Sequence, residues 1–306
     1  MNILITGGTG LIGSFLTKKL LLENHNVSVI TRNIDKAKEL LYEKTNLIEG
    51  DVSVGGNWQE LVNNFDVIIN LAGEPISLSR WSKDKKRKLY QSRILSTKNL
   101  VSSISQNTKV KLFINASAVG YYGIQKDDRN IYESEISGRD FLAQLCKDWE
   151  QEAEKINLKN KNIRLVILRI GIVLSDRGGA IYKLKKIFNS YIGGNIGFGN
   201  NWFPWIHIDD LIDIILFVIN NKKISGAINC TSPNPERFRD FVKYASKTLN
   251  RPKFIYIPSI LPKLVLGESS NLILGGQKAI PRKLLDNNFK FEFEKLELAL
   301  NNILGN

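Results

Sequence analysis

Three evenly spaced glycines near the start of the chain have the pattern of a phosphate-binding turn. Gly7, Gly10 and Gly13 form G-x-x-G-x-x-G, and Gly8 adds an overlapping G-x-G-x-x-G. The pattern follows an apolar run at Ile3–Thr6 and opens an amphipathic stretch, which is the context of a dinucleotide-binding turn. Glycines permit the tight turn and a close backbone approach to a pyrophosphate, and the first amides of the following helix bind the anion. A purely structural turn is the alternative, but this context favours dinucleotide binding.

The residues that follow the second apolar run bear on which dinucleotide binds. Val27–Thr31 is followed by Arg32-Asn33, at the place where NAD-preferring sites usually carry an acidic residue for the ribose 2′-hydroxyl. An arginine there can pair with a 2′-phosphate through two parallel hydrogen bonds. The sequence therefore favours NADP(H) over NAD(H), and the alternative is that Arg32 is a solvated residue at the end of a strand.

Short apolar runs alternate with amphipathic stretches over the first two-thirds of the chain. The strand-like runs are Ile3–Thr6, Val27–Thr31, Leu47–Glu49, Val67–Leu71, Leu112–Ala116 and Leu165–Arg169. The helical patterns are Leu11–Leu22, Trp58–Asn63, Lys83–Ser105 and Gly138–Ile156. This alternation predicts an α/β fold, a Rossmann-type doubly wound parallel sheet with helices on both faces. Ligands of such sheets bind at the carboxyl ends of the strands.

The alternation breaks after about residue 175, where a glycine- and aromatic-rich stretch begins. We expect residues 1–175 to form an NADP-binding Rossmann domain whose sheet is completed by segments at about residues 205–232. Residues 176–306 are then a small mixed α/β C-terminal lobe on the substrate side. Several prolines separate short elements in this part, so we expect it to pack on the carboxyl edge of the sheet and not to form a free domain.

Further motifs stand where later strands are expected to end. Asp51-Val52 follows the third apolar run, where an adenine ring would be met, and Asn70-Leu71-Ala72-Gly73 follows the fourth. Together with the glycine turn, Ser117–Gly123 and Trp205–Asp210, these motifs resemble the extended short-chain dehydrogenase/reductase superfamily. That group contains nucleotide-sugar epimerases and dehydratases.

A narrower resemblance covers essentially the whole chain. Residues 116–123, 149–150, 168–171, 203–207 and 281–284 are similar to the atypical, epimerase-like subfamily, whose members carry a short conserved C-terminal domain. The resemblance implies the fold and NADP(H) binding, but it supplies no substrate. The residues expected to contact the cofactor are Gly7, Thr9, Gly10, Leu11, Ile12, Gly13, Thr31, Arg32, Asp51, Val52, Leu71, Ala72, Gly73 and Arg169.

The catalytic residues typical of the superfamily are incomplete in this chain. Typical members use a Ser or Thr and then Tyr-x-x-x-Lys, in which the tyrosine is the general acid/base. Matching the motifs places the serine position on Ala118, one residue after Ser117, the lysine on Lys147 and the tyrosine on Ala143. The usual tyrosine is therefore missing. The candidates for orienting nicotinamide or substrate are Ser117, Tyr121, Tyr122 and Lys147.

Four other polar residues are candidates for the substrate side of the site. Glu74 and Arg80 lie on a loop expected over the cofactor cleft, and solvated loop residues are the equal alternative. Arg93 replaces an Asn that the superfamily usually carries four residues before Thr97. His207 has a side-chain type whose pKa suits proton transfer, but the favoured interpretation is a structural histidine that ties the C-terminal lobe to the next helix.

Composition limits the partners and the location of the protein. The net charge of +13 suggests a polyanionic partner, and Lys83–Lys88 is the densest basic run. No nucleic-acid-binding signature accompanies this run, so we expect no nucleic-acid partner and interpret the charge as compositional bias. Two cysteines and two histidines favour a reducing compartment and no metal site. No targeting or membrane-spanning pattern is present, which predicts a cytoplasmic protein without a membrane partner.

Two functions remain open from the sequence. The first is an NADP(H)-binding oxidoreductase or nucleotide-sugar epimerase-like enzyme that acts on an unknown small polar substrate, with hydride transfer at the nicotinamide. The second is a non-catalytic NADP(H)-binding sensor or partner scaffold, which the missing tyrosine suggests. An enzyme needs a closed pocket with a substrate-sized void beside the nicotinamide, whereas a sensor needs only the cofactor. The substrate and the oligomeric state cannot be read from the sequence.

Overall fold

A seven-stranded parallel sheet is the centre of the computed structural model, which describes residues 1–76, 79–125, 127–190, 194–251 and 255–305. Its strand order is β11-β6-β5-β4-β1-β2-β3. The strands are β1 (Asn2–Thr6), β2 (Asn26–Thr31), β3 (Asn46–Glu49), β4 (Val67–Asn70), β5 (Leu112–Ala118), β6 (Arg164–Ile170) and β11 (Gly226–Cys230). The order reverses at β1 and β4, which is the switch point of a doubly wound sheet. The Rossmann-type fold predicted from the sequence is confirmed.

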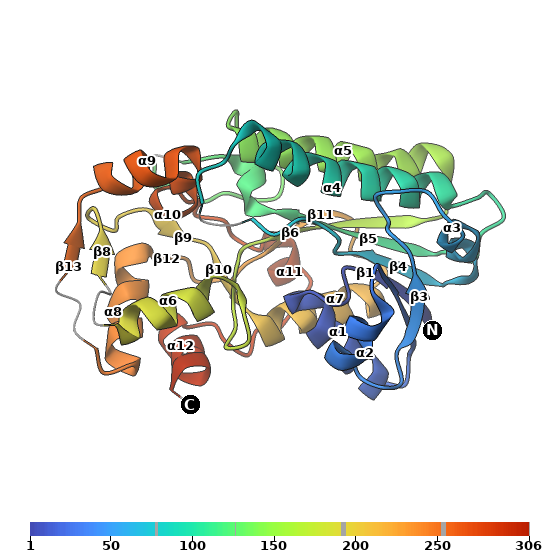
Figure 1. The fold of residues 1–306 in the computed structure, drawn as a ribbon, viewed down its shortest axis with the longest axis horizontal. Coiled ribbons are helices and arrows are strands. Elements are labelled where there is room, and N and C mark those ends of the chain that lie inside the picture. The colour runs from blue at the N-terminus through green and yellow to red at the C-terminus, as the bar shows by residue number, and fades with distance from the viewer. Residues whose placement is uncertain (77–78, 126, 191–193, 252–254, 306) are drawn as a thin grey trace.

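Helices cover both faces of this sheet (Figure 1). On one face lie α1 (Leu11–Leu22), α2 (Ile34–Leu40) and α7 (Ile208–Asn220), which share one apolar core with the strands. On the other face lie the long helices α4 (Lys83–Ser103) and α5 (Phe141–Lys159) with the short α3 (Trp58–Leu61), over a second core. The central strands are buried on both faces, so most side chains of β1, β4 and β6 are apolar.

Polar side chains fix where three of these helices begin. The Asn33 side chain accepts a hydrogen bond from the Lys36 amide at α2, and Ser82 accepts one from Lys85 at α4. Asp140 accepts one from the Ala143 amide at the start of α5. Each cap satisfies an amide that has no partner within its helix, and it also fixes the loop that enters the helix from the carboxyl edge of the sheet.

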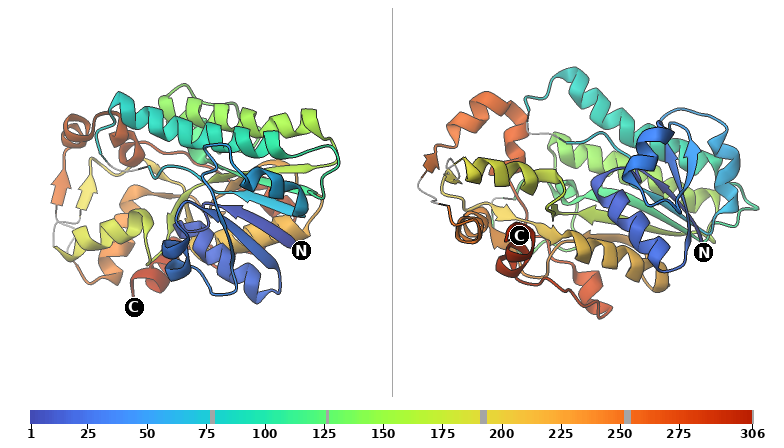
Figure 2. Two further views of the ribbon diagram at one scale, coloured as in Figure 1. Left: turned by 45° about the vertical axis from the view of Figure 1, so that its right-hand side comes forward. Right: turned by 60° about the horizontal axis from the view of Figure 1, so that its bottom comes forward.

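The C-terminal lobe lies at the carboxyl edge of the sheet, at the left of Figure 1 and in both views of Figure 2. It contains three two-stranded sheets, in which β7 pairs with β10, β9 with β12 and β8 with β13. Its strands are β7 (Ile172–Leu174), β8 (Gly194–Ile196), β9 (Trp202–Phe203), β10 (Trp205–His207), β12 (Glu236–Arg237) and β13 (Ile255–Ile257). Its helices are α6 (Gly179–Asn189), α8 (Phe238–Thr248), α9 (Ile260–Leu266), α10 (Asn271–Leu274), α11 (Arg282–Asp286) and α12 (Leu296–Leu304).

The lobe has an apolar core of its own and also shares the core of the main sheet. Phe203, Phe241 and Leu300 belong to the lobe's core. Leu284 and Phe289, from the last thirty residues, instead pack in the core beneath the main sheet. The chain therefore returns from the lobe to the sheet before it ends, and the two parts share buried apolar surface.

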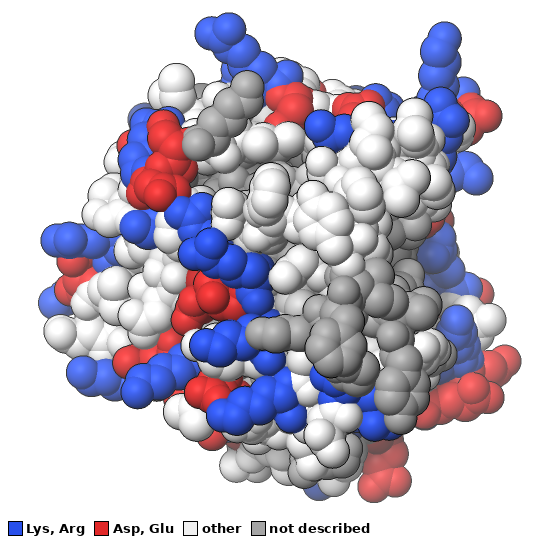
Figure 3. Space-filling view, turned by 90° about the vertical axis from the view of Figure 1, so that its left-hand side faces the viewer, with Lys and Arg blue, Asp and Glu red and all other residues white. Residues whose placement is uncertain are grey.

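Charged side chains are mixed on the outer face of the lobe. Figure 3 shows Lys and Arg interspersed with Asp and Glu there, around a broad uncharged area. None of the described helices is both long and apolar enough to cross a membrane. Within the same residues no group of three His, Cys, Asp or Glu side chains is arranged to hold a metal ion.

Candidate functional site

The glycine turn joins β1 to α1 at the switch point of the sheet. Gly7 has φ of +70°, a left-handed conformation that favours glycine. A Cβ at Gly13 would lie 2.3 Å from the Gly7 carbonyl oxygen, so helix and turn pack more closely than any side chain allows. Gly10 precedes α1 without a side-chain cap, and no acidic residue stands in the first turn of the helix. The first amides of α1 therefore remain available to an anion.

A cavity of about 360 Å³ lies on one side of this turn, between the ends of β2, β3 and β4. Among the residues expected at the cofactor, those that line it are Gly7, Thr9, Gly10, Thr31, Arg32, Asp51, Val52, Leu71, Ala72 and Gly73. We call it the adenosine-side cavity, because the second and third strands of a Rossmann sheet flank the adenosine half of a dinucleotide. Leu11 and Gly13 do not line it, and Ile12 faces a second, larger cavity.

Two cations line the adenosine-side cavity, and the sequence analysis identified one of them. Arg32 follows β2, and Lys36 comes from the first turn of α2, four residues later. The two positions lie four residues apart on either side of the start of α2, and this spacing was the signal that could have identified Lys36. The carboxylate of Asp51 accepts hydrogen bonds from the backbone and the hydroxyl of Ser53, at 2.9 and 2.6 Å. That carboxylate therefore stabilises the turn after β3.

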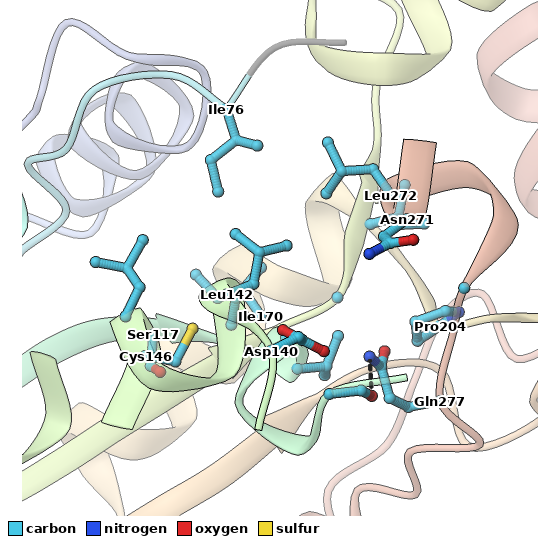
Figure 4. A pocket seen from close by; sticks show the side chains of 18 of the residues that line it. Ile76, Ser117, Asp140, Leu142, Cys146, Ile170, Pro204, Asn271, Leu272 and Gln277 are labelled. Atoms are coloured by element: carbon cyan, nitrogen blue, oxygen red, sulfur yellow. Dashed lines mark hydrogen bonds between the residues drawn. The ribbon is translucent and has the colours of Figure 1, made fainter. Parts of the chain in front are cut away.

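The larger cavity, of about 450 Å³, lies on the other side of the glycine turn (Figure 4). Its floor is the end of β5 and the turn after β6, and its wall is α5 with the loop before α4. The C-terminal lobe closes it with Asn271 and Leu272 of α10 and with residues 275–277. Most lining side chains are apolar, namely Ile12, Ile76, Trp81, Ile124, Phe141, Leu142, Leu145, Ile172, Val173 and Leu272.

The face that α5 turns to this larger cavity carries no acid/base pair. Leu142 and Cys146, four residues apart, line the cavity together with Trp149. Ala143 and Lys147, the positions matched to the family's tyrosine and lysine, point elsewhere. One residue turns a helix by about 100°, so neighbouring positions of α5 face different directions. Burial raises the pKa of the Cys146 thiol to about 12, so it is a neutral, weakly polar lining group.

Ser117 at the end of β5 reaches the cavity, but its hydroxyl is held by a buried carboxylate. The hydroxyl donates to Glu150 Oε1 at 2.6 Å. Arg169 of β6 forms a two-pronged ion pair with the same carboxylate, at 2.9 Å from Nε and 2.8 Å from Nη2. Both charged side chains are almost fully buried. From the sequence, Arg169 was expected to contact the cofactor. In the structure the Arg169 guanidinium lies in this network and lines neither cavity.

Tyr122 belongs to the same buried network. Its hydroxyl donates to Asn229 Oδ1 at 2.6 Å and accepts from Arg169 Nη1 at 2.9 Å. Burial raises the pKa of this phenol well above its usual range, which is the opposite of what a general acid/base needs at neutral pH. Tyr121 stacks on the guanidinium of Arg169, 3.6 Å from the Cζ atom to the ring centre. Neither tyrosine lines the larger cavity.

Arg93 is the cation of the larger cavity. It is the only lysine or arginine among the described lining residues, and 8% of its surface is exposed. Its guanidinium packs over the Trp149 ring, 5.2 Å from the ring centre, and beside Gly73. Nη1 donates to the Leu89 carbonyl oxygen of the same helix at 3.0 Å. Burial lowers the pKa of Arg93, but a guanidinium remains charged at neutral pH.

The other three substrate-side candidates lie away from the larger cavity. Glu74 lines the adenosine-side cavity and pairs with Lys85 at 2.7 Å, which lowers the pKa of its carboxyl. Arg80 is exposed and lies beside Gly267. His207 is buried, caps α7 by accepting from the Asp209 amide, and stacks on the Phe293 ring. His207 therefore has the structural role that was favoured from the sequence, and it lines neither of the two cavities.

Comparisons with known proteins show which family this chain resembles. Residues 3–230 match the family model described as NAD dependent epimerase/dehydratase family, and residues 257–303 match a domain of unknown function, DUF1731. The chain is 36% identical to an epimerase family protein of Staphylococcus aureus, over 99% of this chain and 98% of that protein. It is 34% identical to a chloroplastic SDR39U1 homolog of Arabidopsis thaliana, over 99% of this chain and 87% of that protein.

A solved structure extends the likeness to three dimensions. The human epimerase family protein SDR39U1, solved with NADPH, superposes with a TM-score of 0.85 at 30% identity, and the match covers all of both chains. The resemblance found in the sequence motifs is thus confirmed over both the sheet and the C-terminal lobe. The chain belongs to the NAD-dependent epimerase/dehydratase family.

Proposed function

We propose that the protein is an NADP(H)-dependent oxidoreductase or epimerase-like enzyme whose chemistry takes place in the larger cavity. The observation that carries the proposal is the pair of cavities on either side of one glycine turn. A dinucleotide spanning the turn would place its adenosine in one cavity and its nicotinamide in the other, with the pyrophosphate at the first amides of α1. Bound nicotinamide supplies hydride transfer. The chain's own residues bind it, exclude water and position the substrate.

The choice of NADP(H) over NAD(H) is supported by the charges of the adenosine-side cavity. Arg32 and Lys36 both line it, and no carboxylate stands at the end of β2, where a 2′-hydroxyl would need an acceptor. A 2′-phosphate between an arginine and a lysine would form charge-assisted hydrogen bonds, which are among the stronger ones. The human relative with NADPH supports the same choice.

Binding of NADPH and NADH to three variants tests the cofactor assignment. Arg32→Ala and Lys36→Ala should each weaken NADPH binding about tenfold or more, equivalent to about 1.4 kcal/mol, and leave NADH binding nearly unchanged. Lys38→Ala is the matched control, because Lys38 lies on the same helix, pairs with Asp35 and does not line the cavity. Equal loss of NADPH and NADH affinity in the first two variants would overturn the assignment.

A non-catalytic NADP(H) sensor is the second candidate, and the cavity-facing side of α5 favours it. Leu142 and Cys146 occupy the positions from which an acid/base pair would act. The cavity volume of about 450 Å³ favours catalysis, since a sensor has no need of a substrate-sized void. NADPH oxidation measured with panels of aldehydes, ketones and nucleotide sugars decides between them. An enzyme gives saturable turnover with at least one of these compounds, and Leu142→Trp, which fills part of the larger cavity, should abolish it. Absence of turnover with every panel supports the sensor.

A further inference from the structure

We propose that the larger cavity binds a small molecule with an apolar body and a single carboxylate, and that the carboxylate pairs with Arg93. The proposal rests on the proposed function, since it takes the nicotinamide to occupy part of the same cavity. It narrows the ligand from an unspecified small polar molecule to an aliphatic or aromatic carboxylic acid.

The hydrogen bonding of the Arg93 guanidinium is incomplete. A guanidinium has five N–H donors, and in the described part of the chain only the Leu89 carbonyl accepts from this one. No described carboxylate lies within 4.0 Å of it. The contrast with Arg169 is direct, because that equally buried guanidinium is paired with Glu150 through two hydrogen bonds. A buried cation without a counter-charge costs free energy, which an anionic ligand would recover.

The anionic groups of the cofactor would have partners other than Arg93. The pyrophosphate would meet the uncapped amides of α1, and a 2′-phosphate would meet Arg32 and Lys36 in the adenosine-side cavity. Arg93 lines the other cavity, among Trp149, Cys146 and the end of β5. Its charge is therefore left for a second ligand.

The walls of the larger cavity are largely apolar. Trp81, Leu145 and Leu272, from three separate segments, pack in one apolar cluster that faces the cavity. The two lining carboxylates are engaged, since Asp140 accepts from two backbone amides and Glu268 pairs with Lys86. The Gln277 amide donates to the Gly123 carbonyl. Figure 4 shows the Gln277 bond and, across from it, the Asn271 amide turned toward the cavity.

These walls disfavour a sugar ring. Each hydroxyl of a sugar loses water on entering and needs a hydrogen-bond partner in return, which few lining groups can supply. A nucleotide sugar would also bring a diphosphate, whereas Arg93 is the only cation that the described lining provides. One carboxylate matches one guanidinium, and an apolar body matches the apolar cluster.

Calorimetric titration with matched pairs of acids and amides tests the proposal. The probes are 3-phenylpropionate with 3-phenylpropanamide, octanoate with octanamide, and UDP-glucose, each added to NADPH-saturated and to cofactor-free protein. We expect the acids to bind at least tenfold more tightly than their amides. Arg93→Gln should remove this preference, Arg93→Lys should retain part of it, and Arg87→Gln should leave it intact. Arg87 is the control because it lies on the same helix but is exposed and paired with Asp84.

Three results would overturn the proposal. The first is equal binding of acids and amides to the wild-type protein. The second is tight binding of UDP-glucose that depends on Arg93. The third is loss of NADPH affinity in Arg93→Gln with the acid preference intact, which would assign Arg93 to the cofactor. If the wild-type protein binds no NADPH, the proposed function fails by itself, and the acid and amide titrations of cofactor-free protein still decide the role of Arg93.

Discussion

Glu150 and Arg169 form a buried ion pair that organises the residues beneath the larger cavity. The carboxylate binds Ser117 as well as the guanidinium, and the guanidinium also donates to the Glu133 carbonyl and the Tyr122 hydroxyl. Every strong donor and acceptor of the group is thus engaged within the protein. The sequence showed that these residues stand at strand ends and on one helix, but their mutual pairing depends on side-chain directions that spacing does not encode.

Breaking this pair should be strongly destabilising. Glu150→Gln leaves the Arg169 guanidinium buried without a full counter-charge, and we expect a loss of about 3–5 kcal/mol in the free energy of unfolding. Glu135→Gln, which removes a partly exposed partner of Arg129, should cost under about 1 kcal/mol. Urea unfolding monitored by circular dichroism measures both. Equal, small losses in the two variants would show that the buried pair contributes little.

The hydroxyl of Tyr122 should matter for stability and not for proton transfer. Tyr122→Phe removes the donor to Asn229 and the acceptor of Arg169, so we expect a loss of about 1–3 kcal/mol in the free energy of unfolding. NADPH affinity should stay within about twofold of the wild-type value. Unchanged stability together with a hundredfold fall in an NADPH-dependent turnover would instead assign Tyr122 to proton transfer.

At the scale of single elements, strong periodic patterns were predictable and long-range pairings were not. Six of the seven strands of the main sheet coincide with the apolar runs identified in the sequence, because strands buried in a parallel sheet are largely apolar. The strands β9 and β12, of two residues each, exist only through their pairing with one another. The rotation of α5 about its axis could not be predicted from the sequence either. Tertiary packing decides whether Ala143 and Lys147 or Leu142 and Cys146 line the cavity.

The start of α7 provides a pH-dependent contact with the C-terminal segment. Asp210 accepts hydrogen bonds from the Glu292 and Phe293 amides, yet burial raises the pKa of its carboxyl to about 6. The folded state thus binds this proton more tightly than the unfolded chain, whose Asp pKa is about 3.9. The resulting stabilisation is complete below about pH 4 and is lost as the pH rises through 6.

Asp210→Asn should remove this pH dependence, because an amide does not titrate. We expect the stability of the wild-type protein relative to the variant to fall by about 2–3 kcal/mol between pH 4 and pH 7. Urea unfolding of both proteins at half-unit pH intervals measures the difference. Parallel stability curves would show that Asp210 has the same pKa in the folded and unfolded states.

At the scale of the whole molecule, the C-terminal lobe and the sheet share buried apolar residues and enclose the larger cavity between them. The lobe closes that cavity with α10, and the returning chain places Leu284, Phe289 and Phe291 in the core of the main sheet. Lys283 also donates its amide to the buried Glu133 carboxylate. The sequence predicted that the lobe packs on the sheet and does not form a separate domain. It could not predict which residues of the lobe enter the core of the sheet, because these depend on the fold.

This shared core predicts that damage in the last thirty residues weakens the entire protein. Leu284→Ala deletes a fully buried side chain and should lower the free energy of unfolding by about 2–5 kcal/mol. Its neighbour Leu285 is 40% exposed, so Leu285→Ala is the matched control and should cost under about 1 kcal/mol. Circular dichroism follows both parts, while fluorescence sums five tryptophans, among them Trp58 near the sheet and Trp205 in the lobe. The two signals should coincide in one transition for both variants, because sheet and lobe share the core that Leu284 fills. A separate early transition in Leu284→Ala would mean that the lobe unfolds independently of the sheet.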